Sequence, residues 1–569
     1  MTASVPPADL ALVLEHLDRS PGYDRVRRLR PSFEAATTET VGSLLDQASR
    51  FSSNVLGPLN REMDRFGCAL ENGRVTVKAP GHAAAWREFV ALGWPRLPHR
   101  EELGGAALPL SVALAVQEQF DRGSPSFGML PVSQRSAARL VDAFGSDEQK
   151  AMWLEGLVDG SIGATICVSE AAVGSDVSQL RTRAREADGG WRLEGDKMWI
   201  SFGDHQLSDR ILHCVLANSA APGADPELSV FLVEGGGAQP GAVAVQRIEE
   251  KMGLHGSPTC ELRFENARGT LLGARGRGLS QMFVMITQMR LAVAVGGLAA
   301  ASASADVALA YAEQRKQGGP AQNPVAIIEH ADVQRQIMAM VSKVHILRGL
   351  SFAAGNLADI ADNESDDTVR KAAGDQLAWL LPIAKTFGAE AGFDTASGAI
   401  QILGGAGYTA EWPVERIARD CRVHAIFEGT SGIQALDLVR RRVLRSDSFE
   451  AFMAAANAGK PDERLSSCLH LLEEAVSYLR GLEPGSEVVG RVAMDFLQLA
   501  ILAATGWIAA GLLAQPAQSP AAEVLHAAAR YWLSDLVDRS QLHHARIVGG
   551  APALAEIDVI RRNAGSTAG

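Results

Sequence analysis

A single glutamate, Glu428, follows the apolar pair Ile426-Phe427 and precedes a small polar loop, Gly429 to Gly432. Burial beside an apolar side chain raises the pKa of a carboxylate toward neutral pH, because burial disfavours the charged form. Glycines beside it would let a ligand approach the backbone closely. Glu428 is therefore a candidate general base. The alternative is that Glu428 caps a helix that begins at Ser431.

A glycine-rich segment precedes this glutamate in the chain. Gly405-x-Gly407-x-x-Ala410 fits a relaxed dinucleotide-binding pattern. The residues before it have a helical pattern, however, and Pro413 follows it. Because the strand–turn–helix context is missing, we do not expect a Rossmann nucleotide site here.

A Ser/Gly/Asp-rich turn is predicted where an early strand ends, in ICVSEAAVGSDVSQL (residues 166–180). Ser169, Ser175 and Asp176 surround Gly174 there. Hydroxyls and free backbone N–H groups in such a turn can hold a phosphate or the edge of an isoalloxazine ring. The same composition is also typical of an ordinary loop.

Two further segments carry an aromatic or a cationic candidate. In GDKMWIS (195–201), Trp199 lies two residues before Ser201, which offers an aromatic wall beside a hydroxyl; the alternative is a core tryptophan in a strand. In RKQGG (315–319), Arg315 ends a long predicted helix. A cation there is favourable through the helix dipole alone, but it could also reach a pyrophosphate.

Composition and missing motifs exclude several classes of protein. The 569 residues carry a net charge of −12, which argues against binding nucleic acid through phosphate neutralisation. The six cysteines lie far apart without a CxxC pair, as expected of reduced thiols in the cytoplasm rather than of disulfides or a metal site. The sequence contains no GxxxxGK[ST], HExxH or GxSxG motif and no visible secretory signal.

Hydrophobic periodicity predicts a mainly α, α+β chain with several domains. We expect an N-terminal arm (1–35), a helical domain (36–160), a small antiparallel β domain (161–275), a four-helix bundle (276–445) and a helical extension (446–569). Six strands are predicted in the β domain, at 162–170, 191–195, 210–217, 228–234, 243–248 and 259–266. The bundle helices are predicted at 289–315, 330–361, 366–403 and 431–444.

One uncharged segment, 496–514, is just long enough to span a bilayer. It is rich in Ala and Gly, contains Gln498 and has Asp495 at its edge. We therefore expect a helix buried inside the protein and no membrane span.

The motifs ICVSEAAVGSD, GDKMWIS, YAEQRKQGG, QILGGAGY and IFEGTSGIQ, in α–β–α order, resemble the acyl-CoA dehydrogenase flavoprotein family over about 36–445. The N-terminal arm, HGSPTCEL, IIEHADVQRQI and the helical extension are similar to its larger subgroup, which includes the 3-methylmercaptopropionyl-CoA dehydrogenases. The resemblance implies FAD as cofactor, an acyl-CoA substrate and a homodimer or homotetramer. It also implies electron-transfer flavoprotein as the electron acceptor.

Site residues are assigned by position in the matching motifs. The resemblance implies that Glu428 is the catalytic base and that Arg290 and Phe427 contact the substrate. The residues implied to contact FAD within one subunit are Ser169, Gly174, Ser175, Trp199 and Ser201, with Thr430 near its adenosine part; those implied to contact the partner subunit's FAD are Arg315, Gln317, Gln401, Gly404 and Gly405. The sequence departs from the usual family pattern at Ala171, Gly318 and Phe427, where proline, an aromatic residue and tyrosine are more usual.

The implied reaction is α,β-dehydrogenation to a trans-2-enoyl-CoA. Glu428 removes an α-proton while a hydride leaves Cβ for flavin N5, and the cofactor carries the redox chemistry. The expected substrate is 3-methylmercaptopropionyl-CoA or a short or medium fatty acyl-CoA. The alternatives are an acyl-CoA oxidase that uses O₂, a DNA-associated flavoprotein of the same fold, and a helical scaffold without FAD. The net charge and the presence of Glu428 argue against the DNA-associated protein.

Overall fold

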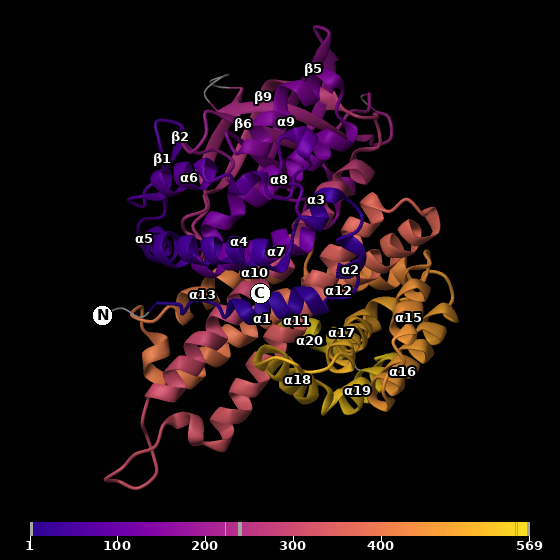
Figure 1. Ribbon diagram of the computed structural model, residues 1–569. Helices are drawn as coiled ribbons and strands as arrows, with labels where there is room; N and C mark the ends of the chain where they lie inside the picture. Colours follow the sequence, from indigo (N-terminus) through magenta and orange to yellow (C-terminus); the bar gives the residue numbers. More distant parts are fainter. Residues whose placement is uncertain (1–3, 222, 237–241, 552–553, 555, 566–569) are drawn as a thin grey trace.

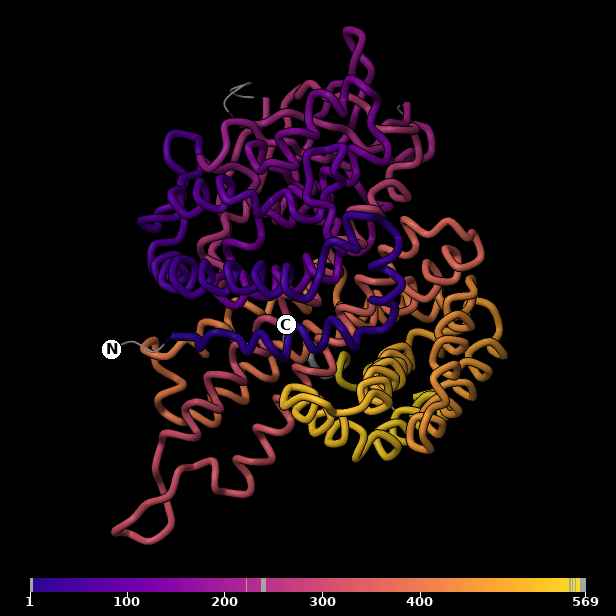
Figure 2. The backbone as a smooth tube through the Cα atoms, viewed as in Figure 1, coloured from indigo at the N-terminus to yellow at the C-terminus, as the bar shows by residue number. Residues whose placement is uncertain are grey.

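The N-terminal helices lie beside the sheet domain, and the C-terminal helices pack at the opposite end of the protein (Figure 1). This computed structural model describes residues 4–221, 223–236, 242–551, 554 and 556–565. Three short helices occupy the expected arm, and the first contacts helices far away in the sequence, so that this segment runs between the two ends of the molecule (Figure 2). The three are α1 (Leu10–Arg19), α2 (Tyr23–Val26) and α3 (Pro31–Glu34).

The helical domain that follows also contains a hairpin, which the sequence analysis did not predict. Strands β1 (Cys68–Glu71) and β2 (Arg74–Val77) pair around Asn72 and Gly73, whose φ angles are 52° and 76°. Asn-Gly with both residues at positive φ is the preferred two-residue hairpin turn. The helices are α4 (Thr38–Phe51), α5 (Gly57–Phe66), α6 (His82–Ala91), α7 (Leu110–Gly123), α8 (Pro125–Phe144) and α9 (Asp147–Asp159).

A seven-stranded sheet forms the middle domain. Its strand order is β3-β6-β4-β5-β9-β7; β8 also pairs with β9, and β7 with β6. The strands are β3 (Ile162–Cys167), β4 (Arg183–Ala187), β5 (Gly190–Ser201), β6 (Arg210–Asn218), β7 (Leu228–Gly236), β8 (Val243–Ile248) and β9 (Thr259–Leu272).

Most pairings in the sheet are antiparallel, as predicted, but two are parallel. Strand β3 pairs with β6 in parallel along its whole length, and β4 meets β6 in parallel through Arg183 and Asn218. A parallel pair needs a long connection rather than a hairpin, and the chain from Cys167 to Arg210 provides it. Strand β4 was not predicted, because its sequence RAREA lacks a clear apolar alternation.

Three long helices dominate the C-terminal domain: α10 (Gly278–Gln314), α11 (Ala331–Asn363) and α12 (Asp367–Leu403). The fourth bundle helix, predicted at 431–444, is present over almost the same residues but is divided into two parts. It consists of α14 (Ser431–Asp437) and a π-helical turn, Leu438–Val443. Helix α13 (Val414–Cys421) lies between α12 and α14 in the chain. The connection between α10 and α11 protrudes from the body of the molecule (Figure 1).

The C-terminal extension packs against the long helices. Its helix α17 (Val488–Ala514) contacts α11, α12 and α14, and Trp379 of α12 stacks on Phe452 with ring centroids 5.7 Å apart. The other helices of the extension are α15 (Ser448–Ala458), α16 (Glu463–Arg480), α18 (Pro520–Leu533), α19 (Leu536–Val548) and α20 (Ile557–Gly565).

Within the described residues, α10, α11 and α17 are long and apolar enough to cross a membrane by length and composition. Their most apolar segments are 78%, 78% and 72% buried inside the protein, respectively. Burial against other helices therefore accounts for the apolar composition of the uncharged segment in α17.

Candidate active site

The turn that carries Glu428 has an unusual backbone conformation. Glu428 is partly buried and has a φ of +55°, in the left-handed region that non-glycine residues rarely adopt. Helix α14 begins at Ser431, and its N-cap is Thr430, whose Oγ1 accepts a hydrogen bond from the N–H of Ile433 at 3.4 Å. The capping role considered for Glu428 therefore belongs to Thr430. The carboxylate is left available for another task.

Two cations face Glu428 from neighbouring helices. Arg290 of α10 donates from Nη1 to Asp437 Oδ2 at 3.2 Å, while its buried Nε has no hydrogen-bond partner among the described residues. Lys385 of α12 is fully buried and donates from Nζ to the carbonyl oxygen of Gly429 at 2.8 Å. The turn thus lies between a buried guanidinium and a buried ammonium group.

Burial sets the ionisation of this cluster. It raises the pKa of Glu428, and the positive charges of Arg290 and Lys385 only partly offset this rise. Burial also lowers the pKa of Lys385 to about 8, even though the negative charge of Glu428 opposes the change. A carboxylate with a raised pKa is suited to take a proton near neutral pH.

The residue before Glu428 is fixed by an aromatic stack. The rings of Phe427 and His424 lie 5.5 Å apart and are inclined by only 10°. His424 is buried, and this burial, together with the charge of Lys385, lowers its pKa to about 4. The imidazole is therefore uncharged near neutral pH where it stacks on Phe427.

The middle domain brings three of the predicted cofactor residues together. The carbonyl oxygen of Ser169 accepts a hydrogen bond from the N–H of Met198 at 2.9 Å, so the Ser-rich turn adjoins the strand that carries Trp199 and Ser201. Trp199 is 54% exposed and has a φ of +60° where the pairing of β5 with β9 shifts register. The core-tryptophan alternative is wrong, because the bulge turns this side chain outward.

A buried ion pair supports the same turn. Lys197 is fully buried, and its Nζ donates to Glu170 Oε1 at 2.9 Å and to the carbonyl oxygen of Val168 at 3.0 Å. Glu170 also accepts from Thr182 Oγ1 at 2.6 Å. These contacts tie together the residues on either side of Ser169.

The remaining predicted FAD contacts within the turn are open to solvent. Ser175 is exposed, and no atom lies within 4 Å of the position that a Cβ would take on Gly174. Gly404 and Gly405 are equally open. Their backbones can therefore be approached closely by a ligand.

The residues predicted to contact a partner's cofactor lie far from the Glu428 turn. Arg315 ends α10, twenty-five residues after Arg290, which is about 37 Å along a helix. Gln317 donates its N–H to Val325 at 2.9 Å within the exposed α10–α11 connection. Gln401 is exposed near the end of α12, sixteen residues after Lys385, which is about 24 Å along a helix. One chain does not bring these residues to the turn that carries Glu428.

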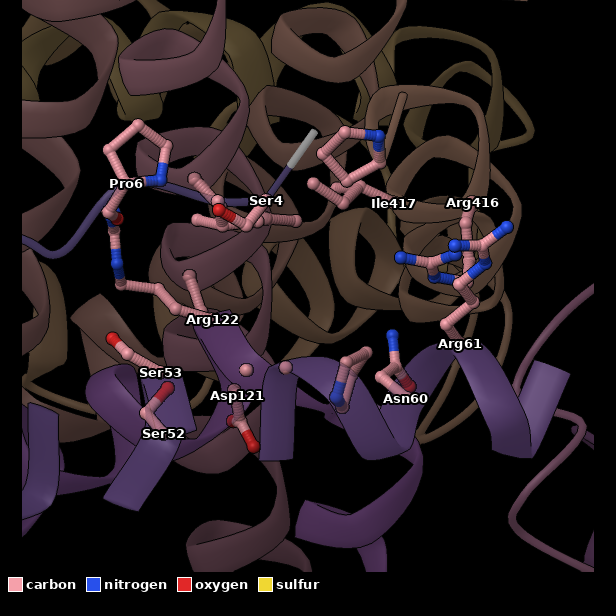
Figure 3. A pocket seen from close by; sticks show the side chains of 18 of the residues that line it. Ser4, Pro6, Ser52, Ser53, Asn60, Arg61, Asp121, Arg122, Arg416 and Ile417 are labelled. Atoms are coloured by element: carbon pink, nitrogen blue, oxygen red, sulfur yellow. The ribbon is translucent and has the colours of Figure 1, made fainter. Parts of the chain in front are cut away.

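His424 is among the residues that line a cavity of about 400 Å³. Figure 3 shows this cavity from close by. The N-terminal segment from Ser4 to Ala8 lies across it, and Arg61 and Arg416 lie near each other at one side. Serines, arginines and acidic residues line it together with alanines, prolines, Trp412 and Ile417, so that its wall is mixed rather than wholly apolar. Glu428 does not line it.

Phe127 of α8 is only 1% exposed. It packs in an aromatic cluster, with its ring centroid 5.6 Å from that of Trp86 and 5.2 Å from that of Phe89. A small cavity of about 50 Å³ adjoins this cluster.

Comparison with known proteins identifies the class. The N-terminal, middle and C-terminal domain models of acyl-CoA dehydrogenase match residues 38–161, 165–267 and 276–444, respectively. The chain therefore belongs to the acyl-CoA dehydrogenase family and is a flavoprotein oxidoreductase that acts on acyl-CoA.

Two relatives agree with this assignment, and a solved structure shares the fold. The chain is 34% identical to 3-methylmercaptopropionyl-CoA dehydrogenase of Ruegeria pomeroyi over 89% of this chain and 90% of that protein. It is 30% identical to the broad-specificity linear acyl-CoA dehydrogenase FadE5 of Mycobacterium tuberculosis, over 79% and 78%. An acyl-CoA dehydrogenase from Bacillus anthracis, solved in complex with FAD, shares the fold with a TM-score of 0.77 and 19% identity over 93% of this chain and 90% of that one.

FAD is the cofactor of this family, and the chain's own residues fit it. An exposed tryptophan beside Ser201 provides a flat apolar surface with a neighbouring hydroxyl. The adjacent turn offers Ser175 and an unobstructed glycine, Gly174. An aromatic side chain held in the open, in a strained conformation, is otherwise unfavourable.

Three residues around the site were missed in the sequence. Lys385 lies in the otherwise apolar run LLPIAK, and a lone lysine on a buried helix is a usable signal for a functional charge. Lys197 and Glu170 gave no such signal, since their pairing depends on the fold of the middle domain.

Proposed function

We propose that Glu428 is the base that removes the α-proton of an acyl-CoA thioester. The observation that carries this proposal is the turn itself. A carboxylate in a strained conformation, released from helix capping, faces two buried cations. Strained residues of this kind are concentrated at active sites.

The backbone of the same residue supports a second role. Among the described residues, the N–H of Glu428 has no hydrogen-bond acceptor. A free N–H beside the base can donate to the thioester carbonyl and stabilise the negative charge that develops there as the α-proton leaves. Glu428 thus supplies both the proton acceptor and one donor for the developing oxyanion.

The other residues of the proposed site bind and orient the substrate and the cofactor. Phe427, fixed by His424, covers one side of the reacting carbons and excludes water. Arg290 binds the CoA part of the substrate and supplies positive charge close to the base. FAD, when bound against Trp199, Ser169 and Ser201, supplies the acceptor for the hydride that leaves Cβ.

Glu428→Gln tests the base directly. The variant should retain yellow, bound FAD, because the amide has nearly the same shape as the carboxylate. Anaerobic bleaching of the flavin by acyl-CoA should slow by at least 10²–10⁴-fold, roughly the contribution of a general base. Bleaching at the wild-type rate would show that the base is another residue.

For the substrate we propose 3-methylmercaptopropionyl-CoA or a fatty acyl-CoA of short or medium length. The support is the 34% identity to the Ruegeria pomeroyi enzyme over nearly the whole chain. Anaerobic bleaching against a panel of acyl-CoAs that differ in length and in heteroatom content tests it. The preferred substrate is the one with the highest bleaching rate constant divided by its dissociation constant.

We propose electron-transfer flavoprotein as the electron acceptor, as is implied by the family. An acyl-CoA oxidase is the alternative on the same scaffold. Turnover without an added acceptor distinguishes them, because an oxidase releases one hydrogen peroxide for each enoyl-CoA. The proposal predicts no stoichiometric peroxide.

We also propose a homodimer or homotetramer. Arg315, Gln317 and Gln401 are exposed and far from the Glu428 turn, which fits contact with a cofactor held by a second copy of the chain. Sedimentation of the FAD-bound protein tests the assembly. A monomer that retains FAD would contradict it.

A further inference from the structure

Side chains from two helices hold the backbone carbonyl groups of Glu428 and Gly429. Lys385 donates to the oxygen of Gly429 at 2.8 Å. Gln434 donates from Nε2 to the oxygen of Glu428 at 2.8 Å, and its distance to the oxygen of Gly429 is 3.3 Å. Both consecutive carbonyls are thus pinned by side chains, although Glu428 and Gly429 have φ angles of +55° and +90°.

The lysine lacks the partner that a buried ammonium group normally has. Within the described part of the chain, Lys385 forms no ion pair within 4.0 Å, and the oxygen of Gly429 is its hydrogen-bond acceptor. Burying a charge in this way is costly unless it is paired. The stability of the fold alone gives no reason to place a lysine here, since an apolar residue would fill the same helix position.

We propose that Lys385 is a positioning residue for proton abstraction: its ammonium group holds the Gly429 carbonyl and so fixes the turn that presents Glu428 to the substrate. This inference rests on the proposed role of Glu428 as the base. Gln434 holds the turn as a neutral donor, whereas Lys385 adds a positive charge that favours the ionised, proton-accepting form of Glu428.

Several other titratable or charged groups lie near Glu428 and Lys385, and they also influence how these two groups respond to pH. Arg290 faces both Glu428 and Lys385, and the neutral His424 lies beside Lys385. Glu390, one turn further along α12, faces Lys385 and is held by Gln498 of α17 at 3.3 Å. Asp437 and Arg442 act on Arg290. Of these groups, the substitutions below remove only Lys385.

The test compares Lys385→Met, Lys385→Gln and Gln434→Met in the FAD-bound enzyme. For each variant, kcat and kcat/KM are measured against pH, with FAD content and thermal unfolding as controls. The acid limb is the fall of kcat/KM on acidification. In Lys385→Met and Lys385→Gln it should move to higher pH, because the charge that favours the ionised form of Glu428 is lost. For each pH unit of movement, kcat/KM below the limb falls about tenfold.

Gln434→Met separates the hydrogen bonds from the charge. It should lower kcat while leaving the acid limb in place, because no charge is lost. Lys385→Gln keeps a donor near Gly429 and should lower kcat less than Lys385→Met. Lys385→Arg, which keeps the charge, should return the limb toward its wild-type position.

Lys371→Met is the matched control. This lysine lies on the same helix, fourteen residues or about 21 Å away, and is exposed and paired with Asp375 and Asp447. It should leave the profile unchanged.

The positioning role is wrong if both neutral Lys385 variants keep the wild-type acid limb and a kcat within twofold of wild type. If a Lys385 variant loses FAD, Gln434→Met and Lys385→Arg still test the positioning role. An unchanged kcat in Gln434→Met together with a displaced acid limb in Lys385→Arg would overturn that role. Failure of the base assignment gives a different result, namely bleaching by Glu428→Gln at the wild-type rate.

Discussion

Two fully buried lysines support two different turns in this protein, and their surroundings differ. Lys197 pairs with Glu170 at 2.9 Å and also bonds a backbone carbonyl. Among the described residues, Lys385 bonds only a carbonyl, although Glu428 lies near enough to influence its pKa. The first lysine completes a closed ion pair beside the turn that carries Ser169, whereas among the described residues the second forms no ion pair with the neighbouring carboxylate.

The pKa values of Glu170 and Glu428 are shifted in opposite directions. Burial raises the pKa of Glu170, but Lys197, Thr182 and backbone N–H groups outweigh burial and lower it overall. For Glu428 burial prevails, and the pKa rises. Hydrogen bonds and an ion pair thus favour the charged form of Glu170, whereas burial favours the neutral form of Glu428.

The largest expected difference is in stability. Lys197→Met leaves Glu170 buried without its counter-ion and should lower the free energy of unfolding by about 3–5 kcal/mol. Lys385→Met removes an unpaired charge and should cost less. Urea unfolding of the two FAD-bound variants measures the difference. Equal losses would mean that the two lysines have the same structural role.

The next effect is on the pH dependence of turnover. The raised pKa of Glu428 places the acid limb of kcat/KM above 4.5, the ordinary value for a glutamate, because the base must be ionised to accept a proton. Glu170 has a lowered pKa, so its stabilising ion pair persists in this range and fails only as the pH falls through that lower pKa. Activity should therefore be lost on acidification before the fold is. Coincident loss of activity and of FAD would contradict this order.

The smallest effect is expected at the helix cap. Thr430→Ala removes the cap of α14 and should cost about 0.5–1 kcal/mol, at the low end for N-caps because its hydrogen bond is long. Thr430→Ser should restore most of this loss. Chemical unfolding measures both changes. An unchanged stability in Thr430→Ala would show that another group caps the helix.

The sequence predicted most about the site where the candidate residues are neighbours in the chain. Glu428, Phe427 and the glycine loop are adjacent in the chain, and the three long helices follow from a long apolar periodicity. Strand β4 was missed because its pairing, rather than its composition, makes it a strand. The outward turn of Trp199 depends on a bulge between β5 and β9, which no local pattern reveals.

The charged residues around Glu428 could not be grouped from the sequence either. Arg290 and Lys385 are ninety-five residues apart, and both lie far from Glu428 in the sequence. Only the packing of α10 and α12 brings them to one turn. Resemblance to the family predicted Arg290, whereas Lys385 emerged from its burial and its hydrogen bond.

Exchange of the substrate's α-protons with solvent tests the central claim most directly. Acyl-CoA is incubated anaerobically in D₂O with wild-type or Glu428→Gln enzyme, each loaded with FAD, and α-deuterium in the recovered substrate is measured by mass spectrometry. If Glu428 is the base, the wild-type enzyme introduces deuterium at the α-carbon and the variant does so at least 10²-fold more slowly, as is typical for loss of a general base. Equal rates of exchange in the two enzymes would contradict the account.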